Sequence, residues 1–276
     1  METKFLDVPG GRLAYDVAGP EGAPLVICTP GMGDTRKVYR FLAPKLAGAG
    51  YRVATLDLRG EGESSVGWDD YRSAAASADQ LALLRHLGAP AVLLSNSYSA
   101  ASSIVAAADA PDLVAGLAMT GPWTRSPQPG GGIQGLIMKV STALVGRIAA
   151  AWTAYYRSLY KGAKPTDLGE YGRDLAATLR EPGRLAALRG MLAGGHDAAA
   201  ARLHEVRCPA LIVMGTADPD FPDPVAEARR IQQQLVASGN DAVVELLEGC
   251  GHYPIAEAAE PTGKAVLAFL DRTYRA

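Results

Sequence analysis

The chain has 276 residues, of which 48% are hydrophobic and 20% are charged, which suits one large α/β domain or a core with an inserted lid. The formal net charge of −2 argues against nucleic acid or an anionic membrane as the main partner. Three cysteines, Cys28, Cys208 and Cys250, lack the spacing of metal ligands. The first residues show no charged-then-apolar leader, so we expect a cytoplasmic protein. We also expect it to act on a small molecule and to be a monomer or a homodimer.

Strand-like segments alternate with helix-like segments along most of the chain. Residues 5–8 and 12–18 flank two glycines and predict a β-hairpin. Six apolar runs predict buried strands, at 24–29, 51–56, 91–94, 114–119, 210–214 and 243–247. Helices are expected at 38–47, at 74–87 with Asp70 as its cap, and at 100–110, 224–237 and 254–274. Together these predict a mostly parallel, doubly wound, eight-stranded sheet with helices on both faces.

The alternation stops after Gly121-Pro122, and residues 123–205 contain no strand-like run. Apolar residues recur at helical spacing over 137–159, 167–180 and 182–193. Charges at Lys139, Arg147 and Arg157 exclude a membrane-spanning helix over the first of these ranges. We therefore predict a core of residues 1–122 and 206–276 with a helical cap of residues 123–205 over the carboxyl ends of the strands. The alternative is a helical decoration packed on one face of the core.

A candidate nucleophile follows the third of the six apolar runs. Ser97 stands in Ser95-Asn96-Ser97-Tyr98-Ser99, a small-x-Ser-x-small pattern between the predicted strand at 91–94 and a helix of small residues. This pattern is typical of a nucleophile elbow, a sharp turn that presents the serine at its tip. Serines occupy both positions at which the pattern usually has glycine. Their small size satisfies the crowding between strand and helix.

A serine hydroxyl needs a base within hydrogen-bond reach, and the base needs an acid that orients it. Asp218 follows the predicted strand at 210–214, and His252 follows the strand at 243–247. Both positions lie at the carboxyl ends of strands, where sites gather in parallel sheets. Asp220 and Asp223 are alternatives for the acid. Cys250 is a less suitable nucleophile than Ser97 because it has no elbow.

The chain resembles the α/β-hydrolase superfamily in its serine-dependent branch with a helical cap. The resemblance rests on the order Ser97, Asp218, His252, on the loops around the last two, and on the segment Asp57-x-Arg59-Gly60-x-Gly62-x-Ser64. Relatives usually have His-Gly after the strand that corresponds to 24–29, whereas this chain has Pro30-Gly31. Asp57 and Arg59 are expected to stabilise their loop.

The resemblance implies a triad of Ser97, Asp218 and His252, with the backbone N–H groups of Met32 and Tyr98 as the oxyanion hole. Trp123 is a candidate for the substrate pocket.

We expect a serine hydrolase that cleaves a small, apolar carboxylic ester or lactone through an acyl-enzyme, without metal or cofactor. A serine nucleophile disfavours haloalkane dehalogenase and epoxide hydrolase chemistry. The alternatives are a carbon–carbon bond hydrolase, thioesterase, amidase or perhydrolase on the same triad, or a ligand-binding member of the fold without turnover.

Overall fold

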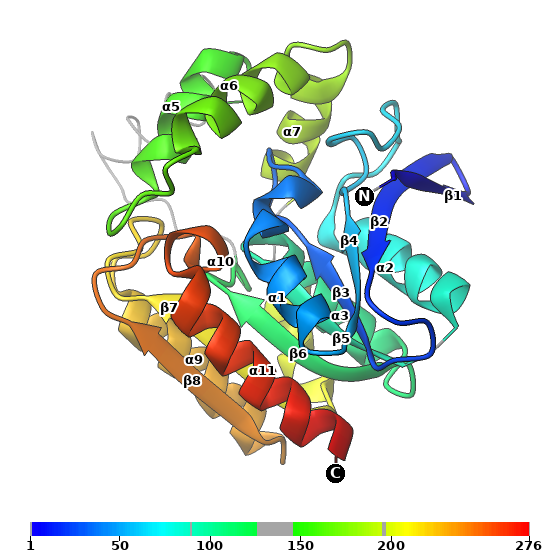
Figure 1. The fold of residues 1–276 in the computed structure, drawn as a ribbon, viewed down its shortest axis with the longest axis vertical. Coiled ribbons are helices and arrows are strands. Elements are labelled where there is room, and N and C mark those ends of the chain that lie inside the picture. Colours follow the sequence, from blue (N-terminus) through cyan, green and yellow to red (C-terminus); the bar gives the residue numbers. More distant parts are fainter. Residues whose placement is uncertain (1, 89, 126–145, 195–196, 276) are drawn as a thin grey trace.

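The computed structural model describes residues 2–88, 90–125, 146–194 and 197–275. An eight-stranded sheet forms the centre of the molecule (Figure 1). Its strands are β1 (Lys4–Val8), β2 (Gly11–Ala18), β3 (Leu25–Thr29), β4 (Arg52–Leu56), β5 (Ala91–Asn96), β6 (Val114–Thr120), β7 (Ala210–Gly215) and β8 (Ala242–Leu247). All eight strands lie where the sequence predicts them. This confirms the predicted eight-stranded doubly wound fold. Central strands such as β3 and β5 consist entirely of buried residues, as the continuous apolar runs predict.

The strand order in the sheet is β1-β2-β4-β3-β5-β6-β7-β8. β1 and β2 pair antiparallel with each other, and β2 pairs antiparallel with β4, while every other pair is parallel. From β3 the chain first adds β4 on one side of β3, and it then crosses over to add β5 on the opposite side of β3. The neighbouring carboxyl ends of β3 and β5 therefore form the switch point at which doubly wound sheets bind ligands.

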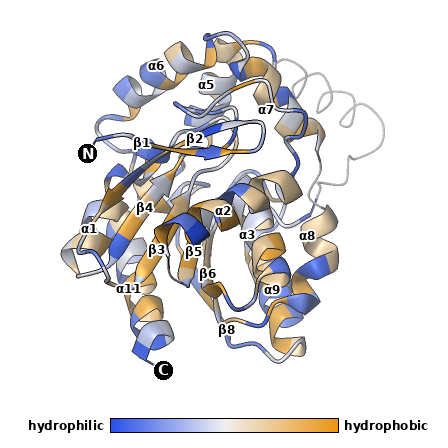
Figure 2. Cartoon of the chain, turned by 90° about the vertical axis from the view of Figure 1, so that its right-hand side faces the viewer, coloured by the Kyte–Doolittle hydropathy of each residue, from blue (hydrophilic) through white to orange (hydrophobic). Residues whose placement is uncertain are grey.

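Helices cover both faces of the sheet (Figures 1 and 2). On one face lie α1 (Leu42–Gly48) and α11 (Ala259–Arg275), with Leu46 and Phe269 in the core. On the other face lie α2 (Ser73–Leu87), α3 (Tyr98–Asp109) and α9 (Pro224–Ala237), with Ile104 and Ile231 buried against the strands. The apolar strands at the centre of Figure 2 thus lie between two helical layers.

Between β6 and β7 the chain forms α5 (Ala149–Ser158), α6 (Leu168–Leu179) and α7 (Arg184–Ala193), at the top of Figure 1. Two further segments, α8 (Asp197–Arg202) and the 3₁₀ helix η2 (Leu203–Glu205), pack against α3 and were not expected from the sequence. Part of the predicted helix at 137–159 lies outside the described residues. Among the residues that the structure describes, no helix is long and apolar enough to cross a lipid bilayer.

Three helix predictions were wrong in detail. The helix expected at 38–47 begins as a 3₁₀ helix, η1 (Arg36–Arg40), and continues as α1. Asp70 does not cap α2, because Asp70 Oδ1 accepts the N–H of Arg72 at 2.8 Å and closes a turn before the helix begins. The helix expected at 254–274 breaks at Ala258 into α10 (Pro254–Glu257) and α11. Pro261 explains the break, because proline is tolerated in the first turn of a new helix but not in the interior of a long one.

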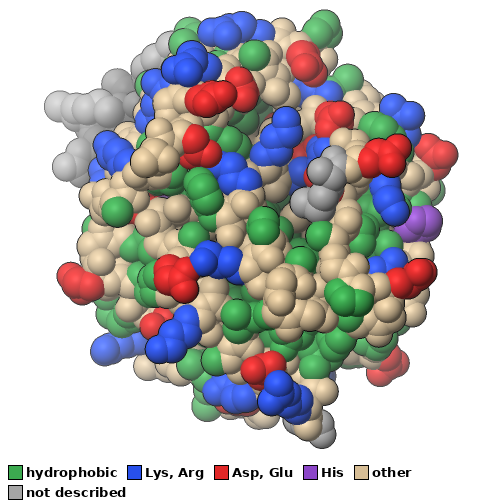
Figure 3. All heavy atoms as spheres, viewed as in Figure 1, with side chains coloured by type: hydrophobic (Ala, Val, Ile, Leu, Met, Phe, Trp, Pro, Cys, Tyr) green, Lys and Arg blue, Asp and Glu red, His purple; other side chains and the backbone are tan. Residues whose placement is uncertain are grey.

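The space-filling view in Figure 3 shows Lys and Arg side chains interspersed with Asp and Glu over the visible face. This mixture of both signs agrees with the formal net charge of −2.

Candidate active site

Ser97 stands at a sharp turn between β5 and α3. Its backbone has φ 56° and ψ −120°, and among the described residues it is the one non-glycine residue with a positive φ. Such a conformation costs on the order of 1–3 kcal/mol and persists only where the surroundings hold it. The N–H of Ser97 donates to the carbonyl oxygen of Thr120 at 3.0 Å, and the N–H of Ala100 donates to the carbonyl oxygen of Ser97 at 3.0 Å. The predicted elbow is therefore present, and β6 holds it in place.

Ser99, which replaces a glycine of the usual pattern, ties the elbow to the neighbouring strand. Its hydroxyl lies 2.7 Å from the carbonyl oxygen of Thr29 at the end of β3. The hydroxyl oxygen of Ser99 in turn accepts the backbone N–H of Asn96 at 3.1 Å. All of these groups are buried. A serine at this position thus supplies hydrogen bonds that a glycine could not.

Ser99→Ala is expected to lower the free energy of unfolding by about 1–3 kcal/mol, because it leaves the buried N–H of Asn96 and carbonyl of Thr29 without this partner. Urea-induced unfolding measures the loss. Ser102→Ala is the matched control, since Ser102 lies on α3 and its buried hydroxyl has no hydrogen-bond partner among the described residues. An equal loss in the two variants would contradict the role of the Ser99 hydroxyl.

Asp218 and His252 lie together, as the sequence predicts. Nδ1 of His252 is 2.7 Å from Oδ2 of Asp218, and both side chains are almost fully buried. Burial disfavours the imidazolium, but the facing carboxylates of Asp218 and Asp220 outweigh it and raise the pKa of His252 to about 9. The geometry suits an acid that fixes the imidazole ring and stabilises its charged form.

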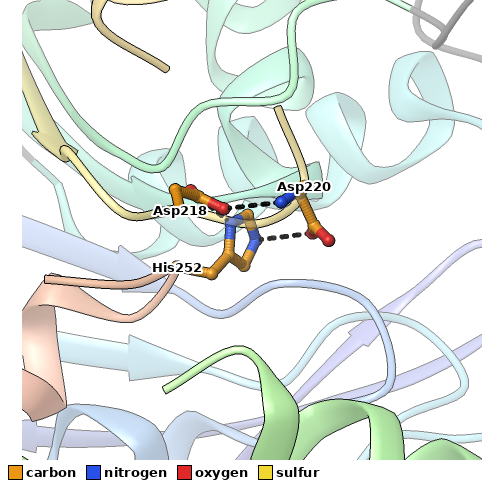
Figure 4. Close-up of side chains that lie close together, drawn as sticks. All are labelled: Asp218, Asp220 and His252. Atoms are coloured by element: carbon orange, nitrogen blue, oxygen red, sulfur yellow. Dashed lines mark hydrogen bonds and ion pairs between the residues drawn. The ribbon is translucent and has the colours of Figure 1, made fainter. Parts of the chain in front are cut away.

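A second carboxylate faces the other nitrogen of the same imidazole. Oδ2 of Asp220 lies 3.5 Å from Nε2 of His252, so the ring stands between the two aspartates (Figure 4). The backbone N–H of Asp220 donates to Oδ1 of Asp218 at 3.0 Å, which holds the two residues in one turn. The hydroxyl of Tyr155 on α5 donates to Oδ1 of Asp220 at 2.5 Å.

Ser97 lies near the Asp218–His252 pair, but the Ser97 hydroxyl makes no hydrogen bond to His252 in the described part of the chain. The adjacent Asn96 reaches the histidine loop, because its Nδ2 donates to the carbonyl oxygen of His252 at 3.3 Å. Ser97, Asp218 and His252 are only 6%, 2% and 1% exposed. These three side chains are therefore largely shielded from bulk water, which strengthens the electrostatic interactions among them.

The loop after β3 lies directly against Ser97. A Cβ atom on Gly31 would stand 3.0 Å from the Cβ of Ser97, so a larger residue here would crowd the serine. Met32 follows in the same buried loop, and Tyr98 opens α3 directly after Ser97. Both backbone N–H groups therefore belong to segments that flank the serine, as an oxyanion hole requires.

Helix α5 packs on this same loop. Nε1 of Trp152 donates to the carbonyl oxygen of Gly33 at 2.7 Å. A Cβ on Gly33, whose φ is +64°, would overlap the Trp152 ring at 2.3 Å. The indole and the glycine therefore fit each other closely, and α5 supports the loop that replaces the His-Gly segment of relatives.

Asp34, in the same loop, is a fully buried carboxyl group. Its Oδ1 accepts the backbone N–H of Thr35 at 2.7 Å and the hydroxyl of Tyr171 at 2.5 Å. Burial raises the pKa of Asp34 to about 6, although these hydrogen bonds act against it. The folded protein therefore holds the proton of Asp34 more tightly than the unfolded chain does, and the charged form opposes folding above that pKa.

Asp34→Asn is accordingly expected to stabilise the protein more as the pH rises. Near pH 4 the carboxyl group is largely protonated when folded, so the variant gains little; above about pH 6 the gain approaches a limit on the order of 3 kcal/mol. Urea-induced unfolding at about pH 4.5 and pH 7.5 measures the difference. A gain that does not grow between the two conditions would contradict the assignment.

The remaining sequence candidates lie near the site in different roles. The backbone N–H of Trp123 donates to the carbonyl oxygen of Ser97 at 3.2 Å, and the partly buried side chain of Trp123 packs against the core. Burial raises the pKa of the Cys250 thiol to about 12, with smaller contributions from nearby carboxylates, so this thiol is inert at neutral pH. Asp57 is buried against Arg36, and Arg59 pairs with Asp79 of α2, which agrees with the expected structural role.

A family model described as the alpha/beta hydrolase family matches residues 26–264. The chain belongs to the alpha/beta hydrolase family. Among curated proteins, an acetyltransferase component of the acetoin cleaving system of Pseudomonas putida is 32% identical over 269 residues, which covers 95% of this chain and 67% of that protein. Proline iminopeptidase PfmaB of Pestalotiopsis fici is 40% identical over 65 residues, only 22% of each chain. The chain thus spans under a quarter of that second relative's length.

Solved structures of hydrolases share the fold over nearly the whole chain. A putative lipase from Acinetobacter baumannii superimposes with a TM-score of 0.83 and 19% identity, over 99% of this chain and 92% of that one. A thermophilic esterase from Thermogutta terrifontis has a TM-score of 0.80 and 18% identity, over 99% of both chains. The enol-lactonase from Burkholderia xenovorans has a TM-score of 0.78 and 19% identity, over 97% and 99%. At these identities the likeness shows the fold.

Three residues of this alpha/beta hydrolase gain importance only from the structure. Trp152 and Tyr155 connect α5 to the loops of the site. Glu257 accepts the N–H groups of Gly251 and Lys161, each at 3.0 Å, and so joins the histidine loop to the chain that leaves α5. Aromatic residues at helical spacing indicate a packed helix but not the loop that it contacts, so the sequence does not single out Trp152 and Tyr155. A lone glutamate such as Glu257 carries no sequence signal of its contacts either.

Asp218, Asp220 and His252 also have ligand atoms within 4.8 Å of one another, a spacing that could hold a metal ion. The direct contact between Asp218 and His252 satisfies both groups within the protein. The arrangement therefore fits an imidazole held by carboxylates more closely than a set of ligands turned toward a shared ion.

Proposed function

We propose that this alpha/beta hydrolase is a serine hydrolase that cleaves a small, apolar carboxylic ester or lactone. The observation that carries the proposal is the strained conformation of Ser97, with φ 56°, at the switch point of the sheet and beside the buried pair of Asp218 and His252. Strain of this kind is retained at functional sites and serves no purpose in a packing serine.

In the proposed mechanism the Oγ of Ser97 attacks the acyl carbon while Nε2 of His252 takes its proton. The backbone N–H groups of Met32 and Tyr98 stabilise the oxyanion, and loss of one such donor typically costs about 10²–10³ in rate. The imidazolium then gives the proton to the leaving alkoxide. Asp218 holds the ring through Nδ1 in both steps. Water, activated by His252, then releases the acid from the acyl-enzyme and restores the serine.

The proposed substrate class follows from the surroundings of the site. Trp152, Tyr156 and Tyr253 are buried aromatic residues close to the oxyanion and histidine loops. Such rings favour an apolar acyl or alcohol group. The fold shared with an esterase and an enol-lactonase supports ester or lactone cleavage.

Hydrolysis of a graded series of p-nitrophenyl esters, beside aromatic and aliphatic lactones, tests this proposal. We expect turnover of esters with short and medium acyl chains, with kcat/KM falling as the acyl chain becomes too long for the space beside Ser97. Thioesters, amides, carbon–carbon substrates and perhydrolysis are assayed in parallel. Turnover of one of these with no hydrolysis of any ester or lactone would contradict the proposed substrate class.

A further inference from the structure

Asp220 faces His252 on the side at which a base must meet its serine. Oδ2 of Asp220 is 3.5 Å from Nε2, while Nδ1 is engaged by Asp218 at 2.7 Å. The hydroxyl of Ser97 has no hydrogen bond to that nitrogen in the described part of the chain. Nε2 has one hydrogen-bonding direction, so it cannot bond well to Asp220 and to Ser97 together.

The position of Asp220 is fixed from two directions. Its backbone N–H donates to Asp218 at 3.0 Å, and its other carboxylate oxygen accepts the hydroxyl of Tyr155 at 2.5 Å. The Tyr155 ring packs against Trp152, with centroids 5.5 Å apart and ring planes at 60° to each other, and the indole N–H of Trp152 donates to the carbonyl oxygen of Gly33. Through α5 the carboxylate is therefore connected to the loop that carries the candidate oxyanion donor.

We propose that Asp220 is a positioning residue that binds the Nε2 side of His252 and competes there with Ser97, and that Tyr155 of α5 holds Asp220 in that place. The inference rests on the proposed function for its kinetic consequence. Its structural part, the contact of Asp220 with a charged imidazole, holds whatever reaction the site performs.

The contact has a defined consequence for protonation. A carboxylate at this distance favours the imidazolium, and the pKa of His252 is accordingly raised to about 9 by Asp218 and Asp220 against the effect of burial. A protonated His252 cannot accept the proton of Ser97. Hydrolysis should therefore increase with pH through a pKa above the usual value for histidine, 6.5.

Other charged or titratable groups surround this pair and remain in place when Asp220 is changed. They are Asp218 from the loop after β7, Tyr155 from α5 and Tyr253 from the histidine segment. Tyr160 lies beside Tyr253, and Cys250 and Glu257 act on Asp218, so these three are one step further from the imidazole. Of these, Asp218 is the one with a direct hydrogen bond to the imidazole. Asp220→Asn therefore removes one charge and leaves the partner of Nδ1 unchanged.

The test measures the pKa of His252 by NMR on ring-labelled histidine and, separately, the pH profile of kcat/KM for ester hydrolysis. The signal of His252 is the one absent from His252→Gln. Asp220→Asn is expected to lower the pKa of His252 by about one unit or more, and to shift the acid limb of the profile to lower pH by the same amount. Tyr155→Phe is expected to shift both in the same direction by less, because the carboxylate loses the hydrogen bond that holds it beside Nε2 of His252.

Two matched controls accompany these variants. Asp223→Asn changes a carboxylate of the same loop that caps α9 through the N–H of Ala226, and Tyr160→Phe removes a buried hydroxyl that pairs with Tyr156. Neither is expected to move the pKa of His252. An unchanged or raised pKa in both Asp220→Asn and Tyr155→Phe would overturn the inference. A lowered pKa in a protein without hydrolytic activity would support the inference while the proposed function fails.

Discussion

Ser97→Ala is expected to reduce hydrolysis of the best ester substrate by about 10⁴–10⁶-fold, because no other group takes over the covalent step. KM should change little, since the residues around the serine and the backbone N–H groups of the elbow remain. The measurement is kcat and KM with the preferred p-nitrophenyl ester. The variant should also be at least as stable as the wild type in urea, because alanine removes a polar group that has no hydrogen-bond partner in the described structure.

Ser102→Ala serves as the control for this comparison. Ser102 is buried on α3, five residues beyond the elbow, and its hydroxyl likewise has no partner among the described residues. We expect nearly full activity in this variant. Equal activity of Ser97→Ala and the wild type would contradict the assignment of the nucleophile.

Asp218→Asn is expected to lower kcat by about 10³–10⁴-fold, because an amide no longer accepts the proton of Nδ1 and holds the wrong tautomer of His252. Two carboxylates, Asp220 and Asp223, stand in the same loop as alternatives for the acid. The structure gives the 2.7 Å contact with Nδ1 to Asp218 and places Asp223 at the N-terminus of α9.

Steady-state kinetics on Asp218→Asn and Asp223→Asn side by side distinguish the two residues. Asp223→Asn should keep its activity, because asparagine also caps helices well. A large loss in Asp223→Asn, with little change in Asp218→Asn, would mean that the acid has been assigned to the wrong residue.

The sequence predicts the eight strands well for physical reasons. Buried parallel strands such as β3 and β5 are continuous apolar runs bounded by glycine, proline or small polar residues, and this signal is local. The carboxyl ends of parallel strands meet at one edge, so the approximate meeting of Ser97, Asp218 and His252 also follows from sequence order. Pro261 carried a further local signal, the break before α11, which the apolar spacing of 254–274 concealed.

Contacts of α5 could not be predicted in this way. The spacing of Trp152, Tyr155 and Tyr156 indicates a helix with a buried face, but the partner of each ring depends on how that helix packs on the core. The structure brings Trp152 to Gly33 and Tyr155 to Asp220. The competition of two carboxylates for one imidazole is likewise a result of tertiary packing, since the sequence offers Asp218 and Asp220 only as neighbouring acids.

The most direct test of the proposed hydrolase is covalent labelling with a fluorophosphonate, followed by mass spectrometry of the intact protein and of its peptides. An activated serine attacks phosphorus and expels fluoride, so we expect one adduct per chain, located on Ser97 and absent from Ser97→Ala. Labelling should become faster as the pH rises through the pKa of His252. An ester-hydrolysing protein that carries no adduct, or carries it on a residue other than Ser97, would contradict the proposed mechanism.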